Sequence, residues 1–168
     1  MTLSEETLEK IHKKIRLPLG LEKSENNFYG LELAVINARK AQKGIQLGGL
    51  NIAGENHGLQ TGLCNIASTN IGSQIGILNI IYYNECFGVQ AGIVNASYQI
   101  CGVQIGITNL VEELRGAQIS AIYNVCGGTD TVGVQLGLIN YRSGNPWYSR
   151  IIPLLAIRTK RKRNIPPS

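Results

Sequence analysis

The chain has 168 residues, of which 43% are apolar, 16% are charged and 20 are glycine, and its formal net charge is +5. This length suits one compact domain, and so many apolar residues with so little charge exclude an intrinsically disordered chain. No apolar run approaches the ~18–20 residues of a membrane-spanning helix. The polar residues 1–14 contain no apolar stretch of a secretory signal, so we expect a cytoplasmic protein by default.

The charge is unevenly distributed along the chain. Residues 1–43 carry a net charge of +2, residues 44–140 carry −4, and residues 141–168 carry +7. A nucleic-acid-binding domain spreads its basic residues over a folded face. The central segment has no such surplus, so the basic character belongs to the C-terminal end.

Residues 1–29 are expected to form an N-terminal cap. Thr2 or Ser4 can begin a short helix over about residues 4–15. A strand-like segment, Ile15–Leu21, follows and precedes a loop over Glu22–Asn27. A cap of this kind covers the first coil of a repeat array and prevents edge-to-edge growth.

Residues 30–140 contain eight copies of an octad of the form Gly-x-Gln-x-Gly-x-x-Asn. Successive leading glycines, from Gly30 to Gly133, are separated by 14, 14, 14, 16, 14, 14 and 17 residues. The first copy has Glu32 in place of Gln, and the seventh copy places Asn124 one residue late. The longer intervals add residues only between octads, which predicts that octads are structural elements and linkers are turns.

The octads predict an all-β fold. Their second, fourth and sixth residues are largely Val, Ile and Leu, which is the period of a β-strand. Two glycines per octad disfavour a helix, because each costs about 1 kcal/mol relative to Ala. We expect a parallel β-solenoid of about eight 14-residue coils, with equivalent residues stacked about 4.8 Å apart and glycines at the corners.

In such a solenoid the amide side chains form two ladders along the stack. Gln lies above Gln and Asn above Asn, so each amide can hydrogen-bond to its neighbours, which we favour over binding of a sugar or ice surface. The expected ladder residues are Gln46, Gln60, Gln74, Gln90, Gln104, Gln118 and Gln135, with Asn37, Asn51, Asn65, Asn79, Asn95, Asn109 and Asn140.

The competing architecture is an eight-stranded antiparallel meander or barrel with strands of about ten residues. Such a fold has no need of a repeat that is one strand long. The seventh octad position, occupied by Leu50, Leu78, Val94 and Ile139, also places apolar groups on the second face of each strand. Both features favour the solenoid.

Residues 141–157 are expected to form a C-terminal cap and residues 158–168 a basic flexible tail. The cap begins with a turn over Tyr141–Tyr148, continues as the apolar Ile151–Ile157, and uses Trp147 to cover the last coil. The basic residues of the tail are Arg158, Lys160, Arg161, Lys162 and Arg163. A run of this kind can contact a membrane surface or a polyanion.

Over residues 15–157 the chain resembles bacterial surface-repeat proteins built from tandem Gly-x-Gln-x-Gly-x-x-Asn units. The resemblance rests on the octads, on the lead-in Phe28–Leu33, and on the closing Asn140-Tyr141 and Pro153-Leu-Leu155. It implies a protein at the cell surface or secreted by a non-classical route. It implies no enzymatic activity, cofactor or ligand.

Catalytic and metal-binding patterns are weak in this sequence. Cys64, Cys86, Cys101 and Cys126 lack the C-x₂-C spacing of a zinc site, so we expect no metal and no cofactor. The linker insertion near residues 80–87 contains tyrosines, and we expect Tyr82, Tyr83 and Tyr98 to form a binding patch.

The sequence therefore predicts a non-enzymatic repeat protein that provides an elongated scaffold or binding surface. Its expected partner is a protein or another repetitive structure, and no small-molecule substrate is expected. Two alternatives stay open: a membrane-inserted or surface β-barrel, and an exported effector that acts in a host cell with the basic tail as its address.

Overall fold

A computed structural model describes residues 15–16, 21–24, 28–128 and 131–159 of the chain. The strands are β1 (Ile15–Arg16), β2 (Leu21–Ser24), β3 (Phe28–Asn56), β4 (Leu59–Cys126), β5 (Val132–Arg142) and β6 (Ile151–Arg158). A 3-10 helix, η1, spans Trp147–Ser149. The helix expected over residues 4–15 lies outside the described residues, apart from Ile15 in β1.

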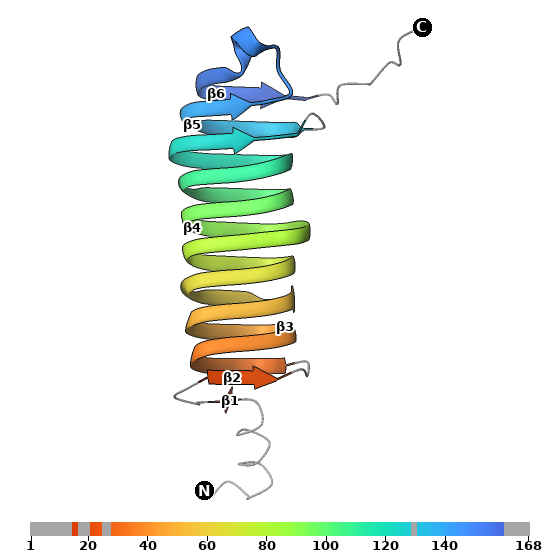
Figure 1. Cartoon of the computed structure of the whole chain (residues 1–168), viewed down its shortest axis with the longest axis vertical. Helices are drawn as coiled ribbons and strands as arrows, with labels where there is room; N and C mark the ends of the chain where they lie inside the picture. Colours follow the sequence, from red (N-terminus) through yellow and green to blue (C-terminus); the bar gives the residue numbers. More distant parts are fainter. Residues whose placement is uncertain (1–14, 17–20, 25–27, 129–130, 160–168) are drawn as a thin grey trace, which may run out of the picture.

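The molecule is a parallel β-solenoid, as the repeat predicts (Figure 1). The register between β3 and β4 pairs residues 14 apart, so Gln46 lies beside Gln60 and Asn51 beside Asn65. The register between β4 and β5 likewise pairs Gln118 with Gln135. This parallel register excludes the antiparallel alternative, since an antiparallel pair would bring different octad positions together.

The linkers within β3 and β4 are not turns, and for them this part of the prediction was wrong. The 68 residues of β4 run through successive octads and linkers without a break and wind around the axis (Figure 1). The linker side chains Ile81, Ile100 and Leu114 are fully buried and belong to the apolar core. Each of these linkers therefore forms a further side of the coil, and it closes the interior against the octads.

The glycines of the octads allow the backbone to approach the coil before, since a Cβ at the leading Gly44 would overlap the carbonyl oxygen of Gly30. Five of the eight leading glycines also have a positive φ in the left-handed region that favours glycine, with 137° at Gly44 and 141° at Gly88. The second glycine allows close contact between coils, because a Cβ at Gly76 would overlap the carbonyl oxygen of Gly62 and lie 2.7 Å from Asn65 Nδ2. In the seventh octad the second glycine is replaced by Ser120, and the register there shifts in a bulge between Ile119 and Tyr123.

The C-terminal end is covered by β6, which pairs antiparallel with β5. The sequence predicted that Trp147 covers the last coil, and this prediction was wrong. Its side chain is 81% exposed and packs edge-on against Tyr148, with ring centroids 5.9 Å apart. The expected loop Glu22–Asn27 also needs correction, because Leu21–Ser24 forms β2 and pairs in parallel with Ile36–Arg39.

Candidate functional site

The interior of the solenoid is built on a ladder of buried glutamines. We number the 14 positions of a coil from its leading glycine, so the glutamines occupy position 3. Each Nε2 donates to Oε1 of the glutamine one coil earlier, at 2.7–3.0 Å, and every side chain in the ladder is fully buried. The bonds join Gln46, Gln60, Gln74, Gln90, Gln104, Gln118 and Gln135 in one series.

Charged residues close both ends of this ladder. Gln46 Nε2 donates to the Glu32 carboxylate at 2.9 Å, and Glu32 is buried beside Arg39, whose Nε donates to it at 2.9 Å. At the other end Arg142 Nε donates to Gln135 Oε1 at 2.5 Å. A carboxylate only accepts and a guanidinium only donates, so the two groups satisfy the free ends of a series of aligned amides.

Sequence reasoning did not assign a role to Arg39 or Arg142. Both arginines stand out in the sequence, because they occupy position 10 of the first and the last copy. The intermediate copies have small or apolar residues at this position, such as Ala53 and Val111. Burial of Arg142 lowers the pKa of its guanidinium. Its Nη2 also donates to the backbone oxygens of Gly133 and Ala156 at 3.0 and 2.9 Å, which ties β6 to β5.

The asparagines at position 8 form a second ladder that runs in the opposite direction. Each Nδ2 donates to Oδ1 of the asparagine one coil later, at 2.6–3.0 Å. The Nδ2 groups also donate to backbone carbonyls of that later coil, as Asn65 does to Ile75 O at 2.9 Å. The series includes Asn124, because the bulge restores its register. Its members are Asn37, Asn51, Asn65, Asn79, Asn95, Asn109, Asn124 and Asn140.

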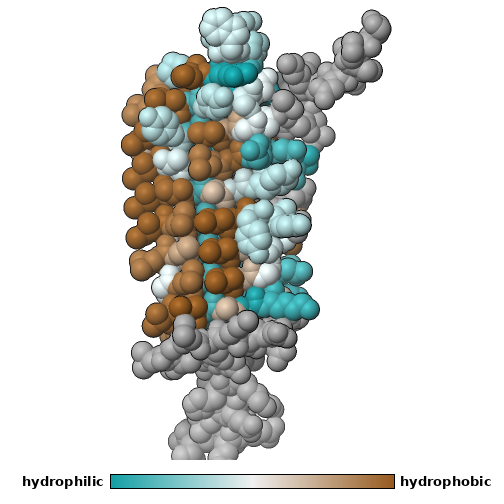
Figure 2. All heavy atoms as spheres, in the orientation of Figure 1, coloured by the Kyte–Doolittle hydropathy of each residue, from teal (hydrophilic) through white to brown (hydrophobic). Residues whose placement is uncertain are grey.

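Because the amides occupy the interior, many aliphatic side chains of the octads lie outside. We call positions 2, 4, 6, 7 and 9 of the eight coils the apolar face. Leu63 is 64% exposed, Ile77 50% and Leu138 59%. Figure 2 shows these side chains as apolar columns along the rod. Not one charged residue occupies these positions in any of the eight coils.

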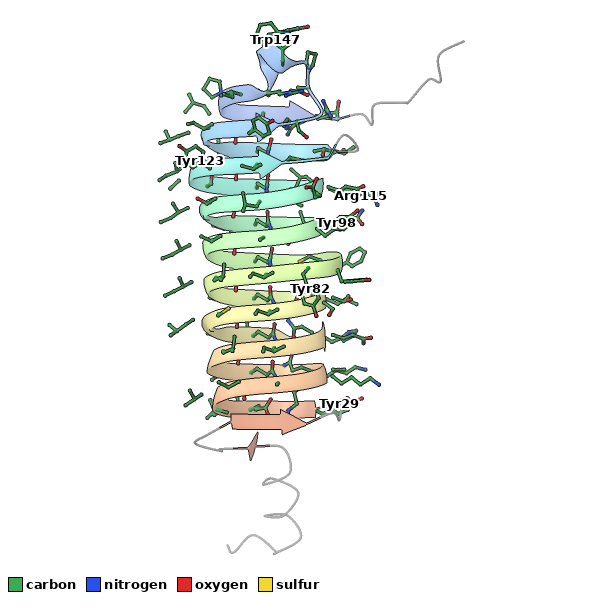
Figure 3. The ribbon with its side chains drawn as sticks, in the orientation of Figure 1. Tyr29, Tyr82, Tyr98, Arg115, Tyr123 and Trp147 are labelled. Atoms are coloured by element: carbon green, nitrogen blue, oxygen red, sulfur yellow. The ribbon has the colours of Figure 1, made fainter. Side chains whose placement is uncertain are left out.

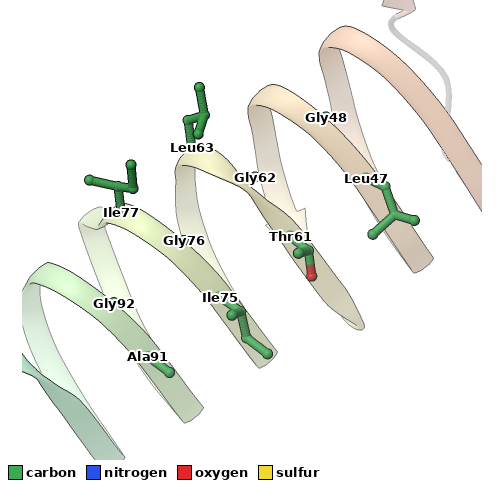
Figure 4. Close-up of a pocket in the computed structure, with 10 residues that line it drawn as sticks. All are labelled: Leu47, Gly48, Thr61, Gly62, Leu63, Ile75, Gly76, Ile77, Ala91 and Gly92. Carbon is green, nitrogen blue, oxygen red and sulfur yellow. The ribbon is translucent and has the colours of Figure 1, made fainter.

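A shallow groove of about 630 Å³ runs along this face. Its floor is made by the second glycines of successive octads, including Gly62 and Gly76. Side chains of position 4, such as Ile75, and of position 6, such as Ile77, diverge on the two sides of these glycines (Figure 4). The apolar face therefore continues around the glycine column onto two sides of the coil.

The tyrosines that the sequence singled out lie on the linker side of the coil. Tyr82, Tyr83 and Tyr98 are 57%, 74% and 54% exposed, and the rings of Tyr82 and Tyr83 meet edge-on with centroids 6.3 Å apart. Figure 3 shows Tyr29, Tyr82, Tyr98 and Arg115 projecting from the same side of the rod. We call the linker positions 11, 12 and 14 the polar edge; they include Lys40, Lys43, Glu55, His57, Glu112, Glu113 and Arg115.

The four cysteines are free thiols. Burial raises the pKa of Cys86 to about 11, and Cys126 is also buried, with Sγ 2.8 Å from Thr131 Oγ1. Among the residues that the structure describes, His, Cys, Asp and Glu form no group of three that could hold a metal ion. The buried thiols of Cys86 and Cys126 pack among the apolar side chains of the core.

Arg158 is the one member of the basic tail within the described residues. It ends β6, and its Nη2 donates to Asn145 Oδ1. Lys160, Arg161, Lys162 and Arg163 lie outside the described residues.

Within the described part of the chain, no helix has the length and apolar character needed to cross a membrane. Comparison with protein families, with curated proteins and with solved structures finds no match to this chain.

Proposed function

We propose that the protein is a non-enzymatic scaffold whose apolar face is the binding surface for a partner. The observation that carries this proposal is the inverted placement of side chains in the octads. Glutamine and asparagine fill the interior at positions 3 and 8, whereas most of the Leu, Ile and Val side chains at positions 4 and 6 are exposed to solvent.

The interior amides support a structural role for the repeat. The ladder amides are buried and hydrogen-bond to their neighbours in the stack, so these polar groups hold the coils together and are not accessible to a partner. The surface that these octads turn outward is mostly aliphatic. A contiguous exposed apolar surface of this kind marks an interaction site rather than a reaction centre.

The test places a photoreactive benzophenone side chain at Ile77 on the apolar face and, as a control, at Glu55 on the polar edge of the second coil. Both positions are exposed, so neither change enters the interior. After illumination of the producing cells, we expect adducts from position 77 and few from position 55. The adduct is identified by mass spectrometry, whether it is a lipid, another protein or a second copy. Equal yields at the two positions, or no adduct at 77, would refute the proposal.

A further inference from the structure

The size of the apolar face limits what can cover it. Positions 2 to 9 of eight coils span roughly 1,000 Å², taking ~3.3 Å per residue along the strand and ~4.8 Å between coils. The largest apolar patch on a typical monomer is about 300–600 Å². The face also extends onto the cap, because Leu155 of β6 pairs with Leu136 and both side chains are exposed.

The rod is amphipathic around its axis. Charged side chains gather on the polar edge together with Tyr82, Tyr83 and Tyr98, and there Lys43 Nζ lies 5.5 Å from the centroid of the Tyr29 ring. The apolar face occupies positions 2 to 9 and turns around the glycine column, so it covers two sides of each coil. A flat protein interface would cover one of these sides, whereas an apolar medium into which the rod sinks would cover both.

The backbone of this face suits contact with hydrocarbon. In a parallel solenoid the backbone N–H and C=O groups bond to the coils before and after, along the axis of the rod, as the register of β3 with β4 shows. The face itself then presents side chains and few free polar backbone groups. This is the condition that a lipid environment imposes on a protein surface.

The charge of the residues at and after the end of β6 indicates the charge of the partner. Arg158 pairs with Gly133 at position 1, where the apolar face meets the polar edge. In the sequence it is followed by the basic residues Lys160, Arg161, Lys162 and Arg163. Residues 141–168 carry seven basic residues and no acidic residue. Basic groups at the boundary between an apolar and a polar surface attract anionic lipid headgroups.

We propose that the protein binds the surface of an anionic bilayer, with its axis parallel to the membrane. The apolar face lies at the boundary of headgroups and acyl chains, the polar edge faces water, and the tail contacts the anionic headgroups. This inference rests on the proposed function, because it names the partner of the same apolar face.

The test is flotation of the purified full chain with vesicles of phosphatidylcholine containing phosphatidylserine, or of phosphatidylcholine alone. We expect flotation with the anionic vesicles. Ile77→Glu should weaken the partition by roughly tenfold or more, since it places a charge in the apolar boundary. Tyr83→Glu adds the same charge in the same coil but on the polar edge, and should leave the partition within about twofold. Each neutral Gln in place of Lys160, Arg161, Lys162 or Arg163 should weaken it by about fivefold.

Circular dichroism checks that each variant keeps the strand content of the parent. Leu63→Glu, at a side chain that is 64% exposed, replaces Ile77→Glu if the latter does not fold. Absence of flotation overturns the membrane proposal. Flotation that is unchanged in Ile77→Glu and in Leu63→Glu overturns it as well. A dimer that Ile77→Glu dissociates, found without flotation, also overturns it, but leaves the proposed function standing with a second copy as the partner. Absence of both flotation and cross-links at position 77 overturns both.

Discussion

Replacement of Gln104 by Leu tests whether the glutamine ladder stabilises the stack. Gln104 Oε1 accepts from Gln118 Nε2 at 2.8 Å, and Gln104 Nε2 donates to Gln90 Oε1 at 2.8 Å. Leu has a similar volume, so the change removes hydrogen bonds without opening a large cavity. Gln90 Oε1 keeps a donor, because Ser97 Oγ lies 2.6 Å away.

The cost of Gln104→Leu therefore comes mainly from Gln118. Its Nε2 is left with a backbone oxygen, Val125 O, at 3.5 Å. A buried donor without a good acceptor costs about 1–3 kcal/mol. The measurement is urea unfolding of the purified chain followed by circular dichroism. Gln99→Leu is the matched control, because Gln99 is only partly buried on the polar edge and should change the free energy of unfolding by less than about 0.5 kcal/mol.

A double variant sharpens this prediction. Gln118→Leu alone deprives Gln135 Nε2 of its acceptor and Gln104 Oε1 of its Gln118 donor. In the double variant Gln104→Leu with Gln118→Leu, only Gln135 Nε2 is left without its partner, because Gln90 Oε1 keeps the Ser97 hydroxyl as a donor. The double variant should therefore cost about as much as one single variant, with a coupling free energy of about 1–3 kcal/mol. Costs that simply add, or a Gln104→Leu variant as stable as Gln99→Leu, would refute the ladder.

Three further changes probe the coil contacts, a buried thiol and the C-terminal closure. Gly76→Ala should destabilise by about 3 kcal/mol, since its Cβ would overlap the carbonyl oxygen of the coil before, whereas Gly49→Ala at position 6 should stay within about 1 kcal/mol in the same urea unfolding. Burial raises the pKa of Cys86 from 9.0 to about 11, so the unfolded chain loses this proton first. The free energy of unfolding should then fall from pH 9 to 11, and fall less in Cys86→Val; equal slopes would contradict this. Arg142→Met removes donors to β5 and β6, and should speed hydrogen exchange in Ile151–Arg158 by about tenfold or more; unchanged exchange would show that Arg142 does not hold this strand.

The repeat in the sequence was sufficient to predict the parallel solenoid and the stacking of its amides. Identical residues at a spacing of 14 need identical surroundings, and only coils stacked in register supply these to every copy. For the same reason Gln46 could be placed beside Gln60 from the sequence alone, as could Asn51 beside Asn65. The sequence likewise indicated that the octad glycines stand where the chain needs a positive φ or a close approach of the backbone.

The tertiary structure decided which groups lie inside and how the series end. Alternation along a strand separates position 3 from positions 2 and 4, but it does not say which set faces inward. Closure of the coil by linker residues such as Ile81 and Leu114 encloses the amides and leaves Ile75 and Ile77 outside. Glu32 and Arg142 lie far apart in the sequence, and only the stacked coils give them the common task of satisfying the two ends of one hydrogen-bonded series.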